Sequence, residues 1–500
     1  MAAYSTINTS DSQSPMDNPD VGGRRQRPKR TYKDAAFSGQ ASWMSSNINL
    51  VNTIIGAGTL AMPLAMAHMG ILLGTIVIVW SAMTASFGLY LQSRCARYLE
   101  RGHASFFALS QMTYPSAAII FDGAIAIKCF GVGVSYLIII GDLMPGVVEG
   151  FNPSAANVPF LVDRQFWITV FMLVVIPLSF LRRLDSLKYT SVVALISIGY
   201  LVILVVYHFA KGDTIANRGP IRVVQWESAI AALSSLPVIV FAYTCHQNMF
   251  SIVNEIKDNS PRTIKSVIGA SIGSACSTYI VVAITGYLSF GGGVGGNIVG
   301  MYVPNVASTI AKAAIVVLVI FSFPLQVHPC RASVVAVLKW RPARWTKSRE
   351  TSVSPSRAAP LLPGSNGHSG RAEVIGDVKF AAITTVIVVL SYIVAMSVSS
   401  LDTVLSYVGA TGSTSISFIL PGIFYYKISS PDSIHHQRLA KDDEDSASAT
   451  NGLFEESGAV RKASHKEAII RYLALGLVIY GFVVMATCLT TNTYFIIVGR

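Results

Sequence analysis

The chain has 500 residues, of which 52% are apolar and only 13% are charged, and its mean hydropathy is +0.52. Soluble globular domains carry about 25% charged residues, so this composition excludes a string of soluble domains and favours a protein that crosses the lipid bilayer many times. The net charge of +12 does not indicate a nucleic-acid partner, because the basic residues flank the apolar segments.

Eleven apolar segments follow one another and predict an all-α membrane protein with about eleven transmembrane helices. The predicted helices are 43–68, 71–93, 116–141, 165–181, 188–208, 228–253, 264–290, 306–328, 378–400, 403–427 and 468–498. Residues 1–42 form a polar tail that we expect to be disordered and cytosolic. Residues 43–500 form the transmembrane domain, which includes two cytosolic linkers at 340–376 and 429–466.

The distribution of lysine and arginine predicts the orientation of these helices. With the N-terminus in the cytosol, basic residues favour the cytosolic segments by about six to one. Eleven crossings then place the C-terminus on the opposite side. None of the six cysteines forms a C-x-x-C pair, and no loop on the non-cytosolic side carries a cysteine or a usable glycosylation sequon. We therefore predict neither a metal site nor a disulfide framework.

The first predicted helix contains the sequence LVNTIIGAGTLAMP at residues 50–63. Small residues in a membrane helix commonly serve close helix packing, and that reading stays open. The alternative is a helix that unwinds at mid-membrane at Gly56 and Gly58, so that the positive end of its second half can bind a carboxylate. The candidate substrate-binding residues of this segment are Thr53, Gly56, Ala57, Gly58 and Thr59.

The sixth predicted helix has a similar interruption, FAYTCHQN at residues 241–248. Polar residues at this depth are costly and usually functional, so Phe241, Tyr243 and Thr244 are further candidates for substrate binding. The alternative is a helix that ends near Tyr243, which would leave the following polar residues at the interface. Paired interruptions in the first and sixth helices are typical of a transporter built from inverted repeats.

Two further polar residues lie inside predicted helices. Ser322 can offer its hydroxyl oxygen to a cation or bond back to its own helix, and the sequence favours neither. Lys128 lies near the centre of the third helix, where a lysine must pair, reach the interface or lose its proton. Its role can be in ion coupling or purely structural.

The segments 50–63 and 241–248, together with SFPLQVHPCR at residues 322–331, resemble the first, sixth and eighth helices of the amino acid/auxin permease family. The similarity is greatest to its fungal vacuolar branch, and it extends to the sodium-coupled neutral amino acid transporters. It implies a leucine-transporter-like fold of five plus five inverted helices and one more. It also implies secondary active transport of amino acids and no activity as an enzyme.

By the same resemblance, Asn52, Ile55 and Ser322 match the region where sodium-dependent members bind their ion, and Lys128 is added as a coupling candidate from its depth. No cofactor is expected beyond the coupling ion, a proton or sodium. We expect a proton and the vacuolar membrane, with sodium coupling at the plasma membrane as the alternative. An amino acid sensor that signals through its cytosolic segments remains a second hypothesis. The sequence indicates no oligomeric state.

Overall fold

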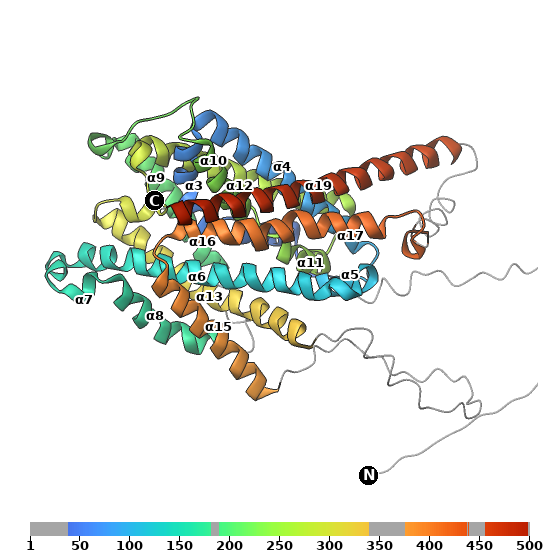
Figure 1. Ribbon diagram of the computed structural model, residues 1–500, viewed down its shortest axis with the longest axis horizontal. Helices are drawn as coiled ribbons and strands as arrows, with labels where there is room; N and C mark the ends of the chain where they lie inside the picture. The colour runs from blue at the N-terminus through green and yellow to red at the C-terminus, as the bar shows by residue number, and fades with distance from the viewer. Residues whose placement is uncertain (1–38, 182–189, 340–375, 438, 440–455, 499–500) are drawn as a thin grey trace, which may run out of the picture. The chain divides into compact units, whose positions relative to one another are not determined.

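The computed structural model describes residues 39–181, 190–339, 376–437, 439 and 456–498. The predicted tail up to residue 38, nearly all of the linker 340–376, and residues 438 and 440–455 of the linker 429–466 lie outside the described residues. Helices dominate the described residues, as Figure 1 shows. They are α2 (Trp43–Ile54), α3 (Ala57–Met69), α4 (Ile71–Ala96), α5 (Phe106–Thr113), α6 (Ala118–Phe151), α7 (Pro159–Val162), α8 (Arg164–Ser179), α9 (Thr190–Lys211), α10 (Ala229–Ala242), α11 (His246–Glu255), α12 (Pro261–Phe290), α13 (Val306–Lys339), α15 (Asp377–Ser397), α16 (Leu401–Val408), α17 (Leu420–Ile428) and α19 (Glu456–Val498).

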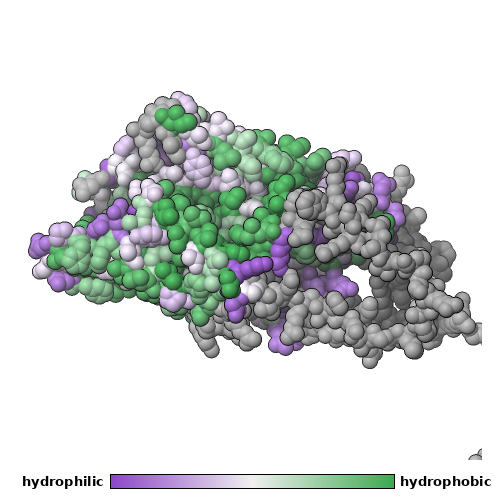
Figure 2. Space-filling view, turned by 60° about the horizontal axis from the view of Figure 1, so that its bottom comes forward, coloured by the Kyte–Doolittle hydropathy of each residue, from purple (hydrophilic) through white to green (hydrophobic). Residues whose placement is uncertain are grey.

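The helices agree with a polytopic membrane protein. Within the described ranges, nine helices are long and apolar enough to cross a membrane, and the bent pair α2 and α3 makes a tenth. The fourth predicted span corresponds to α8, a shorter apolar helix of 16 residues. Figure 2 shows a face on which apolar side chains cover the middle of the bundle while polar residues gather toward its ends. The predicted all-α membrane fold is confirmed.

Several helices are longer than the predicted spans. α6 continues to Phe151 instead of residue 141, α13 continues to Lys339 instead of residue 328, and α19 begins at Glu456 instead of residue 468. At 1.5 Å per residue, the 34 residues of α6 exceed the roughly 30 Å thickness of the hydrocarbon core. Hydropathy detects only the part of a helix that lies in the membrane, so it cannot find ends that project beyond it.

The described chain starts and finishes at opposite ends of the bundle. The backbone of Ala41 pairs with the end of α11, since its N–H donates to the Glu255 carbonyl over 2.9 Å. At this same end Arg94 of α4 forms an ion pair of 2.9 Å with Glu467, near the start of α19. Figure 1 shows that α19 runs along the length of the bundle to the other end. This arrangement requires an odd number of crossings.

Both predicted helix interruptions are present. α2 and α3 are bent by 54° at Ile55 and Gly56, and α10 is separated from α11 by residues 243–245. Because α11 continues to Glu255, the alternative in which the sixth helix ends near Tyr243 is wrong. The unwound stretch of the first helix is shorter than predicted, because Gly58 already lies in the first turn of α3.

The two breaks lie side by side in the bundle. A methyl group added at Gly58 would come within 2.6 Å of the Ala242 Cβ, so the absence of a side chain at Gly58 lets α3 approach α10. The packing interpretation is therefore right for Gly58. A methyl group added at Gly56 would meet no atom within 4 Å, so Gly56 belongs to the break itself. The hydroxyl of Tyr279 on α12 lies 2.7 Å from the Ile54 carbonyl and 2.8 Å from the Ala242 carbonyl. Its single proton is donated to one of them at a time or shared between them, so Tyr279 bridges the two broken helices.

Candidate functional site

A cavity of about 440 Å³ lies at the two helix breaks. It extends toward the end of the bundle where α2 begins and α11 finishes, because its lining includes Asn49 of α2 and Asn248 of α11. Ten of the twelve predicted site residues line this cavity. They are Asn52, Thr53, Ile55, Gly56, Ala57, Gly58, Lys128, Phe241, Thr244 and Ser322.

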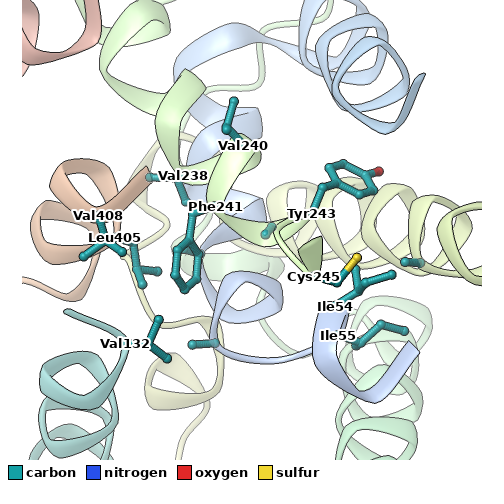
Figure 3. Close-up of a cluster of buried hydrophobic side chains, with 14 of the residues drawn as sticks. Ile54, Ile55, Val132, Val238, Val240, Phe241, Tyr243, Cys245, Leu405 and Val408 are labelled. Carbon is teal, nitrogen blue, oxygen red and sulfur yellow. The ribbon is translucent and has the colours of Figure 1, made fainter. Parts of the chain in front are cut away.

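The other two predicted residues, Thr59 and Tyr243, are not among the residues that line the cavity. Thr59 is fully buried in α3. Tyr243 turns away from the cavity and packs edge-on against Tyr279, with ring centroids 5.1 Å apart. Figure 3 shows the Tyr243 and Phe241 rings pointing to different sides of the break, with Phe241 directed toward Val132 of α6. The sequence indicated both aromatic residues as candidates for substrate binding, but it could not predict which of the two rings faces the cavity.

The cavity also contains polar residues that the sequence reasoning missed. Tyr136, Gln247 and Gln326 line it, as does Asn248, whose amide donates a 2.7 Å hydrogen bond to the Thr53 hydroxyl and so links the first and sixth helices. The sequence could have indicated Gln326 as a cavity residue. It follows Ser322 by four residues and therefore lies on the same face of α13.

The start of α3 offers unoccupied backbone donors to this cavity. Its N-cap residue, Gly56, makes no side-chain hydrogen bond to the helix. The first N–H groups of any α-helix lack partners within the helix and carry the positive end of the helix dipole. Ala57 and Gly58 provide these groups here and line the cavity. The arrangement can bind a carboxylate through backbone donors.

The predicted cation ligands are also brought together. Asn52, Ile55 and Ser322 line the same cavity although they belong to different helical segments. The Ser322 hydroxyl donates to the Leu318 carbonyl over 2.8 Å, so it does bond back to its own helix, yet its oxygen retains a lone pair that can accept a ligand. The Ile54 carbonyl is already engaged by Tyr279, which leaves the neighbouring oxygens of the break for a cation.

A second cavity of about 270 Å³ lies on the other side of the breaks. It is lined by Ala61 and His68 of α3, Val238 of α10, and Asn492 of α19. Val238 precedes Phe241 of the first cavity by three residues, so less than one helical turn of α10 separates the linings of the two cavities. Two cavities separated by so thin a wall suit a protein that exposes one site to either side in turn.

Known proteins similar to this chain were found by sequence and by structure. Residues 39–445 match the family described as "Transmembrane amino acid transporter protein". The chain is 43% identical to vacuolar amino acid transporter 5 of Schizosaccharomyces pombe, over 91% of this chain and 95% of that protein. It is 39% identical to vacuolar amino acid transporter 6 of Saccharomyces cerevisiae, over 90% of this chain and 98% of that protein.

More distant similarities extend the comparison. The human sodium-coupled neutral amino acid transporter 4 is 24% identical over 79% of this chain and 80% of its own. Among solved structures, the crystal structure of MhsT in complex with L-phenylalanine matches with a TM-score of 0.51 and 12% identity, over 90% of this chain and 99% of that one. At this identity the structural match bears on the fold alone, and it agrees with the expected leucine-transporter-like fold.

Proposed function

Because the chain belongs to the transmembrane amino acid transporter protein family, we propose that it is a secondary active transporter that moves amino acids across the vacuolar membrane, coupled to protons. Membership of this family identifies a transporter and not an enzyme. The observation that carries the proposal is the cavity at the paired breaks of the first and sixth helices, where backbone donors and polar side chains converge.

In this proposal the substrate binds at the breaks. Its α-carboxylate accepts hydrogen bonds from the N–H groups of Ala57 and Gly58, which no side chain caps. Its side chain extends along the part of the cavity lined by Phe241, Thr244 and Tyr136. These groups come from different helical segments, so a shift of α2 and α11 against the remaining helices would open or close the site.

The vacuolar location and the orientation have separate support. The similar proteins from two yeasts carry names that describe vacuolar amino acid transporters. The non-cytosolic loops lack cysteines and usable sequons, which suits an internal membrane better than the cell surface. The excess of basic residues on the side where α2 begins supports a cytosolic N-terminus.

Proton coupling is preferred to sodium coupling on the similarity to the vacuolar amino acid transporters alone. Lys128 is the basic side chain that lines the cavity, and it is the candidate for carrying the coupled proton. The similarity to a protein named as sodium-coupled keeps sodium as the alternative. A sodium ion would use the oxygens of Asn52, Ile55 and Ser322, because hard cations prefer several oxygen ligands.

Reconstitution tests this function. Purified protein in proteoliposomes should catalyse counterflow of a labelled amino acid, and an imposed proton gradient should drive net flux in sodium-free buffer. A protonophore should abolish the net flux and leave counterflow intact. Flux that requires sodium and ignores the proton gradient would contradict proton coupling, and the absence of counterflow for every amino acid would contradict transport itself.

A further inference from the structure

The cavity at the helix breaks contains a basic side chain that no acidic residue of the described chain neutralises. Among the described residues that line it, Lys128 is the only one with a full charge, and no aspartate or glutamate is present. The Lys128 side chain is only 4% exposed. No hydrogen bond or ion pair joins it to another residue of the described chain. Burying an ammonium group without a partner is unfavourable, so Lys128 holds a proton stably only when a negative partner from outside the chain enters the cavity.

The position of Lys128 directs its side chain into the cavity. Lys128, Val132 and Tyr136 follow one another at intervals of four residues and all line the cavity, so they form the face of α6 that is turned toward it. Behind Lys128 the backbone of α6 packs tightly against Gly412, where an added Cβ would come within 2.6 Å of the Lys128 Cβ. Gly412 belongs to the π-helical segment Gly409–Ser413. This contact fixes the base of the lysine side chain.

Two separate positive groups therefore face one cavity. The uncapped start of α3 binds one carboxylate in the proposed function, and Lys128 remains for a second negative group. We propose, on the basis of that function, that Lys128, once it carries the coupled proton, pairs with a carboxylate on the substrate's side chain. The cavity then prefers dicarboxylic amino acids to their neutral amides. It disfavours basic amino acids, because their side chains would bring a like charge beside Lys128 with no acidic residue to compensate.

The test compares glutamate with glutamine, two substrates that differ in charge and hardly in size. In proteoliposomes that hold wild-type protein, glutamate should compete for counterflow at a lower concentration than glutamine, and aspartate at a lower concentration than asparagine. Lysine and arginine should compete least. In the Lys128→Gln variant the preference for glutamate over glutamine should fall by at least about 30-fold, since truncating one partner of a buried charge pair costs about 2 kcal/mol or more. Lys128→Arg should retain the preference.

Lys312→Gln is the matched control. Lys312 is also a buried lysine, 3% exposed, but its ammonium donates to the Tyr302 carbonyl over 2.9 Å and it does not line the cavity. This variant should keep the wild-type ratio of glutamate to glutamine, whatever its effect on the amount of folded protein.

Each other outcome has a definite meaning. If Lys128→Gln lowers glutamate and glutamine transport equally, Lys128 serves only the α-carboxylate or the coupling ion, and the specificity proposal is wrong. If the variant leaves both substrates unchanged, the proposal is also wrong. If the Lys128→Gln variant does not fold, the ranking of competing amino acids in the wild-type protein decides. Equal affinity of the wild-type protein for glutamine and glutamate would overturn the proposal. Failure of the proposed transport function itself would give a different result, because no amino acid would then show counterflow.

Discussion

The contact between the two broken helices can be tested at Gly58. A methyl group at this position would lie 2.6 Å from the Cβ and 2.9 Å from the Cα of Ala242, whereas ordinary contacts begin near 3.4 Å. Gly58→Ala must therefore push α3 and α10 apart by about 0.8 Å, the difference between 3.4 and 2.6 Å. Overpacking of this kind typically costs about 1–3 kcal/mol. We expect a lower unfolding temperature of the purified protein, together with reduced counterflow, because the start of α3 holds the substrate carboxylate.

Gly56→Ala is the control for this measurement. Gly56 lies two residues away in the same region, yet a methyl group there meets no atom within 4 Å. The unfolding temperature of the Gly56→Ala variant should stay near the wild-type value. Heating the purified protein in detergent and measuring the remaining folded fraction by size-exclusion chromatography gives the unfolding temperature of both variants under the same conditions.

A double variant makes the test stringent. Combining Gly58→Ala with Ala242→Gly transfers the methyl group from α10 to α3, so that the two helices can return to their original separation. The double variant should be more stable than the sum of the two single effects predicts. The reasoning would be refuted if Gly58→Ala unfolded at the wild-type temperature, or if the two effects were simply additive.

Three further predictions concern the same region. Tyr279→Phe removes the hydroxyl whose one proton is shared by a carbonyl on each broken helix. It should lower the free energy of unfolding by about 1–3 kcal/mol, and an unchanged unfolding temperature would show that water replaces the hydroxyl. Under the sodium alternative, Asn52→Ala and Ser322→Ala should weaken sodium-driven flux while counterflow persists, and unchanged sodium coupling in both variants would exclude the cation site. Gly39→Val would press a side chain against two backbone carbonyls at the end of α11, so hydrogen exchange at the start of α2 should rise, whereas Gln40→Ala, at an exposed position, should leave it unchanged.

Much of this protein is determined locally and could be predicted from its sequence. The apolar segments and both helix breaks follow from short stretches of sequence, because a bilayer requires about 20 apolar residues per helix and makes polar or glycine-rich interruptions costly. Ten of the twelve predicted site residues line the cavity for the same reason. Polar residues near a break in a membrane helix are costly in contact with lipid, so they face a cavity or the protein interior.

The tertiary structure decided what depends on contacts between distant segments. Phe241 lines the cavity and Tyr243 packs against Tyr279 of α12, and both directions depend on helices that are distant in the sequence. Gly58 serves packing and not unwinding because Ala242, far away in the sequence, lies directly against it. Lys128 faces the cavity without a carboxylate partner because no acidic residue of the described helices folds into its neighbourhood. The direction of a side chain and the identity of its neighbours are properties of packed helices, and no single segment of the sequence contains them.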